Sequence, residues 1–366
     1  MDISNILASY DTSKLTIGVL GGHSALDVCA GAKKLGFRTL CVAQNGREKT
    51  YSEYYKSNGV TGCIDELVIV DKFADIVKPE VQKKLQDLNT IFVHNRYFWV
   101  YCDFDEIENN FNVPIYGSRG LVRLEERDHP ENQYVMLQKA GIRIPKIFNN
   151  PREIDRLAIV KVNEAHRKYE RAFFVVTSPQ SFEEEASKRI ASGLINKEDL
   201  SHATIEEFII GAQVNFNFFY SPITKKLELM GTDMRRQTSL DGFLRLDAET
   251  QLNVLNAGYR PTMVETGHVA VTVKESLLEK IFEAGEKFVK QSGIIGPFAL
   301  QGAIATEEGR EEIVIFDVSM RIPGSPGTAY TPYTNYLYGR NLSFGERIAM
   351  DIKEAVEQEK LKLVLT

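Results

Sequence analysis

Long apolar runs are missing from this chain, and their absence excludes a helical membrane protein. No run approaches the roughly 18 consecutive apolar residues that a membrane-spanning helix requires. The first residues, MDISNILASYDTSK, lack the basic start and apolar core of a secretory signal peptide. We therefore expect a cytoplasmic protein without a membrane partner.

Cysteine is scarce, and the four that occur form no CxxC pair. Metal sites built from cysteine usually show such closely spaced pairs. We interpret the four as reduced and mostly buried thiols rather than as metal ligands or catalytic groups. They all lie in the first third of the chain: Cys29, Cys41, Cys63 and Cys102.

An excess of positive charge is also missing. The chain has 44 Lys and Arg against 50 Asp and Glu, which gives a formal net charge of −6. A general binder of nucleic acid or of an anionic membrane surface normally carries a basic excess. We expect no nucleic-acid partner.

What is present is a chain of 366 residues with 43 % hydrophobic side chains, enough for two or three domains with sizeable cores. In the first third, short β-branched runs alternate with helical patterns. This alternation predicts an α/β fold with a doubly wound parallel sheet. The expected strands are residues 15–20, 38–44, 67–70 and 90–94, and the expected helices are residues 25–37 and 78–88.

Ligands of such a sheet bind at the carboxyl ends of its strands, where Gly21, Gly22, His23 and Ser24 follow the first strand. The GxGxxG pattern of dinucleotide-binding proteins is absent. Two glycines before a helix nevertheless suit an anion. The alternative is a tight turn in which Ser24 only caps the helix.

The rest of the chain has a different pattern of predicted strands and helices. Two strands flank residues 164–172 and are expected to form a hairpin, and five further strands follow. No linker of low complexity separates these parts, so we expect closely packed domains. The expected strands are 156–162, 173–178, 203–211, 215–222, 227–233, 297–305 and 311–322, and the expected helices are 130–140, 181–192, 275–291 and 343–358.

Lys161 ends an apolar strand about 45 residues before the segment EEFIIG, which starts at Glu206. A buried strand lysine can reach a nucleotide phosphate, an acidic side chain can bind a ribose, and linker backbone groups can pair with a purine edge. Taken separately, Lys161 reads as a surface lysine and EEFIIG as an ordinary strand.

Gln301 and Asp317 lie on two strands joined by a short acidic turn. Placed opposite each other, they offer the oxygen ligands that Mg²⁺ or Mn²⁺ takes beside substrate phosphates. Arg321 and the glycine- and proline-rich residues 323–327 follow, where a cation can steady a transferring phosphoryl group. The alternative is a structural carboxylate at Asp317.

Three arginines cluster after residue 233 and suggest an anion pocket. They are Arg235, Arg236 and Arg245. A solvated charged surface is the competing interpretation.

Taken together, these residues resemble the ATP-grasp ligases and, more narrowly, the archaeal formate–phosphoribosylaminoimidazolecarboxamide ligase (FAICAR synthetase) family. The similar motifs run along nearly the whole chain: LGGHSALDVCAGAKKLGF, AGIRIPK, IVKV, IEEFIIG, ELMGTDMRR, ETGHV, GPFALQ and FDVSMRI. The resemblance implies an ATP-grasp fold preceded by a Rossmann-like domain. We divide the chain accordingly into residues 1–120, 121–212 and 213–366.

The resemblance also implies an activity. Formate attacks the γ-phosphate of ATP, and the formyl phosphate formed is captured by the amine of 5-aminoimidazole-4-carboxamide ribotide (AICAR). The implied contacts of ribotide and formate are His23, Ser24, Tyr97, Arg235, Arg245 and His268, with Arg321 as a second catalytic group beside His23. The implied ATP contacts are Lys161, Glu206, Glu207, Phe208, Ile209 and Glu228, and the implied metal ligands are Gln301 and Asp317.

Three departures from the family pattern leave alternatives open. Residues 162–171 contain no glycine where the family covers the ATP phosphates with a glycine-rich loop. Tyr97 replaces a small hydroxyl residue, and His268 replaces an asparagine. The alternatives are a related ligase for another carboxylate and amine, or a nucleotide-binding relative with weak or no catalysis. The resemblance further implies a homo-oligomer, a trimer or hexamer.

Overall fold

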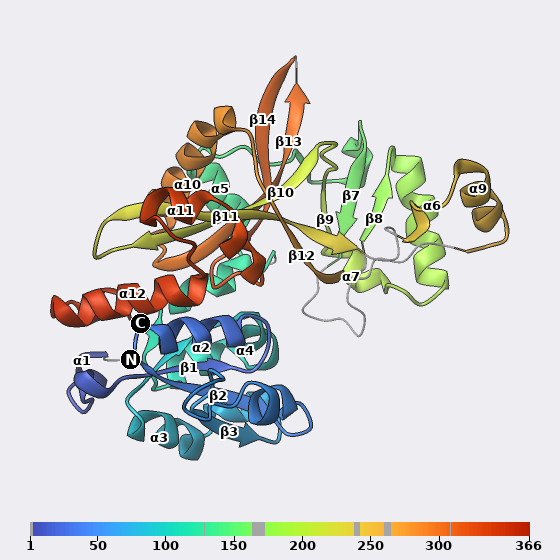
Figure 1. The fold of residues 1–366 in the computed structure, drawn as a ribbon. Coiled ribbons are helices and arrows are strands. Elements are labelled where there is room, and N and C mark those ends of the chain that lie inside the picture. Colours follow the sequence, from blue (N-terminus) through green and yellow to red (C-terminus); the bar gives the residue numbers. More distant parts are fainter. Residues whose placement is uncertain (1–2, 128, 163–172, 238–241, 260–264, 308) are drawn as a thin grey trace.

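The computed structural model describes residues 3–127, 129–162, 173–237, 242–259, 265–307 and 309–366. Within these ranges the strands form three sheets, two with five strands and one with four. Figure 1 shows the first sheet at one end of the molecule, the third sheet above it, and the second sheet projecting to one side.

The first sheet is parallel, in the strand order β3-β2-β1-β4-β5. The prediction of a parallel sheet in the first third is confirmed. The sequence predicted four of its strands, and the short fifth strand was missed. The bounds are β1 Thr16–Leu20, β2 Arg38–Gln44, β3 Glu66–Val70, β4 Thr90–Val93 and β5 Ile115–Tyr116.

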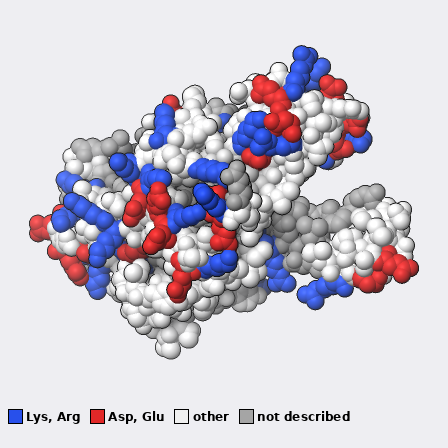
Figure 2. All heavy atoms as spheres, turned by 90° about the horizontal axis from the view of Figure 1, so that it is seen from above, with Lys and Arg blue, Asp and Glu red and all other residues white. Residues whose placement is uncertain are grey.

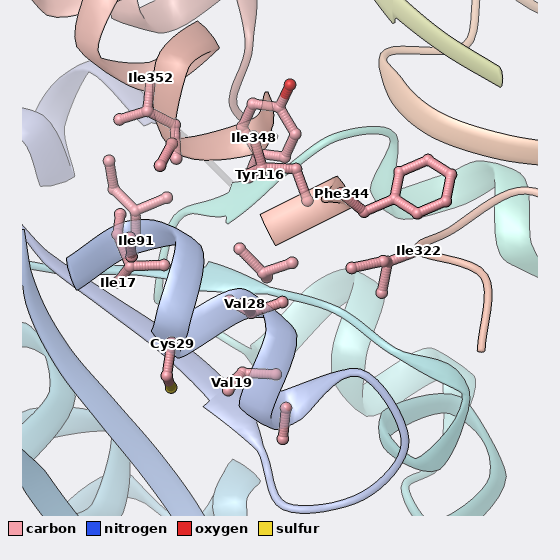
Figure 3. Close-up of a cluster of buried hydrophobic side chains, with 14 of the residues drawn as sticks. Ile17, Val19, Val28, Cys29, Ile91, Tyr116, Ile322, Phe344, Ile348 and Ile352 are labelled. Atoms are coloured by element: carbon pink, nitrogen blue, oxygen red, sulfur yellow. The ribbon is translucent and has the colours of Figure 1, made fainter. Parts of the chain in front are cut away.

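Helices cover both faces of this sheet, as a doubly wound fold requires. On one face, α2 (Ala25–Lys34) packs beside α12 (Phe344–Glu357), although the two are some 300 residues apart in sequence (Figure 3). A Cβ atom added to Gly31 would lie 2.0 Å from the Glu346 nitrogen. The absence of a side chain at Gly31 therefore permits the close helix contact. The other face carries α3 (Pro79–Asp87) and α4 (Arg96–Tyr101).

The second sheet has four strands, in the order β6-β9-β7-β8. It is antiparallel and has its own small apolar core. Strands β7 and β8 pair directly, which confirms the strand pair predicted on either side of residues 164–172. It contains β6 Ile147–Phe148, β7 Ala158–Lys161, β8 Phe173–Val176 and β9 Thr204–Glu207, with α6 Pro179–Ala191 and α7 Lys197–Ser201 beside it.

The third sheet is antiparallel, in the order β12-β11-β10-β13-β14. One face is apolar and packs on α10 (Leu278–Ser292) and on α5 (Gln133–Lys139). The edge strand β12 was not predicted because its residues include Glu265, Gly267 and Ala270, which are residue types depleted in strands. The strands are β10 Ala212–Ser221, β11 Lys226–Gln237, β12 Glu265–Val271, β13 Gly296–Glu307 and β14 Arg310–Ser319.

The remaining helices are short: α1 Ile3–Leu7, α9 Ala248–Asn256 and α11 Tyr333–Tyr338. The four cysteines are buried free thiols, as expected. No helix in the described part of the chain is long and apolar enough to cross a membrane. Figure 2 shows basic and acidic side chains interspersed over the face seen from above.

Each sheet lies within one of the three expected segments, except that β10 begins one residue before the third segment, at Ala212, and we retain that division as a proposal. The packing nevertheless crosses its boundaries in two places. Met136 and Leu137 of α5 belong to the core of the third sheet. Phe344 and Ile348 of α12 belong to the core of the first sheet.

Candidate functional site

The Gly21–Ser24 turn follows β1, and it is held more firmly than a simple connection requires. Ser24 has a left-handed backbone (φ 68°) and caps α2 without any side-chain hydrogen bond to the helix. Its hydroxyl instead donates to the Pro323 carbonyl oxygen over 2.8 Å. The alternative of a plain capping serine is therefore wrong, because the side chain ties the turn to residues 323–325.

Asn95 and Arg96 fix the backbone and ring of His23. The buried Asn95 amide donates to the carbonyl oxygens of Leu20 (2.7 Å) and His23 (3.2 Å). The Arg96 backbone N–H donates to His23 Nε2 over 3.2 Å, and His23 Nδ1 lies 3.0 Å from Ser24 Oγ. His23 is thus an oriented ring at the carboxyl edge of the first sheet.

Tyr97 forms one wall of this turn. Its ring meets the His23 ring edge-on with 5.9 Å between centroids. A Cβ atom added to Gly22 would lie 2.4 Å from the Tyr97 ring. Tyr97, which replaces the family's small hydroxyl residue, therefore leaves no room for a side chain at Gly22.

Residues 323–325 connect His23 to the third sheet. The His23 ring lies against Gly324, where a Cβ atom would be 3.4 Å away. Ser325 Oγ, from the same short segment, lies 3.0 Å from His268 Nδ1 on β12. The two histidines therefore flank one loop that follows directly after Arg321.

A row of polar side chains crosses one face of the third sheet. Gln301 on β13 lies opposite Asp317 on β14 and, on its other side, opposite Asn215 on β10. Asn215 in turn lies opposite Asp233 on β11. Arg235 reaches along this face and donates to Gln301 Oε1 over 3.0 Å. The expected pairing of Gln301 with Asp317 is the observed register.

Asp233 is the most buried acid of this row, 1 % exposed. Asn217 donates to it over 2.6 Å and Asn215 over 3.1 Å. His268 Nδ1 contacts its second oxygen at hydrogen-bonding distance. All four side chains point to the same face as Gln301.

Lys161 and Glu206 form a buried ion pair at the edge of this row. Lys161 is 6 % and Glu206 is 2 % exposed, which rules out a surface lysine. The Tyr134 hydroxyl contacts Glu206, accepts from Lys161 over 3.2 Å, and lies 3.0 Å from the Phe316 carbonyl oxygen. Tyr134 therefore joins the second sheet to β14, one residue before Asp317.

Arg127 adds a second cation. Its guanidinium lies 3.7 Å from an Asp317 oxygen. Burial alone would raise the pKa of Asp317, but Arg127, Lys161 and Arg235 outweigh it and hold the pKa below its ordinary value. Burial lowers the pKa of Lys161, against the attraction of Glu206 and together with the repulsion of Arg127. The candidate site thus concentrates positive charge beside one ionised carboxylate.

The segment after Glu206 fits a purine edge only in part. The amides of Glu207 and Phe208 donate to Lys146 and Leu157 carbonyl oxygens over 2.8 and 2.9 Å. Within the described residues, Ile209 is the first amide of this segment without a backbone partner. The Glu206 side chain contacts Lys161 and Tyr134, and its contact with ATP stays a prediction.

Arg321 is a buried cation held by Glu125. The guanidinium lies 3.4 Å from one Glu125 oxygen, and the other accepts the Met320 amide over 2.6 Å. Burial lowers the pKa of Arg321, and Glu125 opposes that effect. Arg321 therefore lies between β14 and the loop that contacts His23, and its catalytic role stays a prediction.

Two expected site residues lie elsewhere. Glu228 is buried in a bidentate ion pair with Arg347 of α12, at 2.8 and 2.9 Å, so the expectation that it binds ATP is not supported. Its strand position is opposite Phe219, well before Asp233, where β11 meets α12. Arg245 is exposed in the segment just before α9, and Figure 1 shows α9 at a distance from the third sheet. The glycine-free segment expected over the phosphates includes residues 163–172, which lie outside the described residues.

Sequence reasoning missed several members of the site. Asn215 and Asn217 alternate with phenylalanines in NFNFFY, and that alternation of polar and apolar residues was the available signal. Arg127, Tyr134 and Glu125 precede or begin α5 and carry no local pattern. They reach the candidate site only because this segment packs on β14.

Gln301 and Asp317 suit a magnesium or manganese ion in their chemistry. Both present oxygens from neighbouring positions of the sheet, beside cations that would face phosphates. No cluster of three or more His, Cys, Asp or Glu side chains that could hold a metal alone occurs in the described ranges. A metal there would rely on substrate oxygens for its other ligands.

Comparison with known proteins agrees with this arrangement. Two family models match this chain. The model described as a protein of unknown function (DUF1246) matches residues 17–148, and the model described as a domain of unknown function (DUF1297) matches residues 181–366. A 5-formaminoimidazole-4-carboxamide-1-(beta)-D-ribofuranosyl 5'-monophosphate synthetase of Methanopyrus kandleri is 37 % identical over 371 residues, covering 100 % of this chain and 99 % of the relative. The synthetase of that name from Methanobrevibacter smithii is 37 % identical over 374 residues, covering 100 % and 98 %.

Solved structures show the same fold. An IMP biosynthesis protein PurP from Thermococcus kodakaraensis superposes with a TM-score of 0.68 at 25 % identity, covering 96 % of this chain and 100 % of that one. An N5-carboxyaminoimidazole synthetase from Staphylococcus aureus, complexed with ADP, gives 0.54 at 12 % identity, covering 87 % and 74 %. The fold is ATP-grasp preceded by a Rossmann-like domain, and the chain belongs to the family of the 5-formaminoimidazole-4-carboxamide ribotide synthetases.

Proposed function

We propose that this protein is an ATP-dependent carbon–nitrogen ligase that formylates AICAR with formate in purine biosynthesis. One observation carries the proposal. The loop 323–325, which follows Arg321, links His23 of the first sheet to His268 on the face of the third sheet that also holds Gln301 and Asp317. This link supports a single substrate cleft, with the phosphate-facing cluster on the third sheet and His23 facing the ribotide.

The first step activates formate, whose carboxylate is a poor acylating agent. One formate oxygen attacks the γ-phosphorus of ATP, and the bond to the β,γ-bridging oxygen breaks, giving formyl phosphate and ADP. Lys161 and Arg127 supply the positive charge that steadies the phosphoryl group, and Arg321 faces the anionic formate. Their burial makes these charges effective because little water screens them.

Gln301 and Asp317 would hold Mg²⁺ or Mn²⁺ beside the ATP phosphates. The ion supplies charge neutralisation for the phosphoryl oxygens when it is bound. Arg127 and Arg235 already contact these two side chains and would hold them in place for the ion.

The second step joins carbon to nitrogen. The AICAR amine attacks the formyl carbon, the bond from that carbon to the phosphate oxygen breaks, and inorganic phosphate leaves. His23, oriented by Asn95 and the Arg96 amide, contacts the ribotide and formyl group at the junction of the two sheets. Formyl phosphate hydrolyses readily, so the reaction requires a site from which water is excluded.

The direct test incubates the purified protein with ATP, Mg²⁺, formate and AICAR. We expect ADP, phosphate and the formamide in equal amounts, with each substrate required. ATP cleavage with a different carboxylate or amine, but not with formate and AICAR, would identify a related ligase instead. Absent or millimolar binding of MgATP by calorimetry would identify a nucleotide-binding relative without catalysis.

We also propose that the chain forms a homo-oligomer, a trimer or hexamer. The support is an exposed aromatic and aliphatic group on and before α11. Tyr330 is 84 %, Tyr336 is 68 % and Leu337 is 58 % exposed. Light scattering coupled to size exclusion tests this, with a monomer at micromolar concentration as the contrary result.

A further inference from the structure

We propose that His268 is a catalytic base of the formyl-transfer step, oriented by the buried carboxylate of Asp233. This inference rests on the proposed function and adds to it a route for the proton of the amine. The structure brings the pair to the same loop that contacts His23, although the two histidines are about 245 residues apart in sequence.

The carboxylate of Asp233 is built to hold one imidazole nitrogen. Asn217 donates to one oxygen over 2.6 Å, and Asn215 donates to the other over 3.1 Å. That second oxygen also contacts His268 Nδ1. This carboxylate is 1 % exposed and cannot leave its position without losing both amide donors.

The same contacts fix the tautomer of His268. The Asp233 carboxylate only accepts hydrogen bonds, so its contact places the ring proton on Nδ1, and Ser325 Oγ lies 3.0 Å from the same nitrogen. The lone pair of the neutral ring is therefore on Nε2. An imidazole oriented through Nδ1 by a carboxylate is the arrangement in which Nε2 accepts a proton from a nucleophile.

The position suits the reacting amine. His268 lies opposite Arg235 in the register of β11 and β12, and Arg235 contacts Gln301. On the other side, Ser325 and Gly324 lead to the His23 ring. His268 thus lies between the phosphate end of the cleft and the histidine that contacts the ribotide.

The step balances without another reactant. The amine nitrogen donates its electron pair to the formyl carbon, and the carbon–oxygen bond to phosphate breaks with its electrons going to phosphate. The nitrogen, now positively charged, passes one proton to His268 Nε2. The imidazolium that forms is stabilised by Asp233, and it later returns the proton to solvent or to the departing phosphate.

The experiment compares H268N and D233N with the wild type in two reactions: formate-dependent ADP release without AICAR, and formamide production at saturating AICAR. H268N installs the residue that the family pattern has at this position. We expect kcat for formamide production to fall at least tenfold, and to fall more than ADP release does. The exposed His202 provides the matched control H202N, which should behave as the wild type.

The pH profile separates catalysis from a structural role. In the wild type, log kcat for formamide production should fall with unit slope on the acid side, where His268 is protonated. H268N should lose that limb, and D233N should keep it at a displaced pH. Among the described residues, the charged or titratable groups near the ring include Asp233 and Arg235 on β11 and His23 beyond the loop, so H23N is profiled in parallel to assign the limb.

Three results would overturn the inference. They are an unchanged kcat in H268N, an equal loss of both reactions, or an effect on the KM for AICAR alone. If H268N does not fold, the wild-type profile and D233N decide. A wild type that releases ADP but never forms the formamide would reject the proposed function instead, which is a different outcome.

Discussion

Glu228 on β11 and Arg347 on α12 form a bidentate ion pair in the interior, with N–O distances of 2.8 and 2.9 Å. The Arg347 guanidinium also lies 4.3 Å over the Phe219 ring. Because α12 packs on the first sheet and β11 belongs to the third, this pair joins the two domains that supply the cleft.

We predict that E228L destabilises the protein by about 3 to 5 kcal/mol, since it leaves Arg347 buried without its partner. The double variant E228L/R347M should recover a large part of that loss because it removes both charges. Urea unfolding measures both values. Equal destabilisation by the single and double variants would show that the ion pair is not the source of the loss.

The contact between Gly22 and Tyr97 predicts a paired result. G22A places a methyl group against the Tyr97 ring, displaces the wall beside His23 and should raise the KM for AICAR at least fivefold. G22A/Y97S should reverse most of this increase. G120A is the control, because nothing lies within 4 Å of an added Cβ there and its φ is not positive. A double variant no better than G22A would contradict the account.

The burial of His94 leads us to predict that the stability of the protein depends on pH. His94 accepts the Trp99 indole N–H over 2.8 Å at Nδ1, and burial, with the charges of Arg321 and Arg119, lowers its pKa to about 3. The unfolded chain takes up a proton near pH 6.5, and the folded protein does not. Stability from this group is therefore fully present above pH 6.5 and is lost as the pH falls, by about 1.4 kcal/mol per pH unit.

Urea unfolding between pH 7.5 and 5 measures that dependence. In H94Q the contribution should be absent, so the slope below pH 6.5 should be smaller than in the wild type by about 1.4 kcal/mol per unit. H202Q, at an exposed position, should retain the wild-type slope. Parallel slopes for wild type and H94Q would show that His94 is not held neutral.

Lys161 predicts a selective loss of nucleotide binding. K161M removes a buried cation beside Asp317 and should weaken MgATP binding at least tenfold, or about 1.4 kcal/mol. Binding of AICAR should change less than twofold. K188M, on the exposed face of α6, is the matched control. Calorimetric titration distinguishes these outcomes, and equal weakening of both ligands would indicate a general disturbance.

The sequence predicted those parts of the fold and site that depend on local pattern. The alternation of strands and helices predicted the first sheet, and two strands joined by a short turn placed Gln301 opposite Asp317. The ATP contact of Glu228 was implied only by the family resemblance, and in the structure Glu228 is paired with Arg347. The strand instead carries Glu228 toward α12 and Asp233 into the cleft.

The rest depends on contacts between distant segments. Arg127 and Tyr134 reach the cleft because the segment around α5 packs on β14. No periodicity of apolar residues in the sequence predicts that packing. The pairing of Asp233 with His268 requires the edge strand β12, which its composition does not predict. These long-range contacts supply the second cation and the oriented histidine.

The most direct test of the account follows oxygen from formate. With formate labelled by ¹⁸O at both oxygens, ATP, Mg²⁺ and AICAR, activation through formyl phosphate predicts one ¹⁸O in the phosphate and one in the formamide, with one ADP for each product. Mass spectrometry of both products reads this out. Phosphate free of ¹⁸O, or ADP released without labelled formamide, would contradict it.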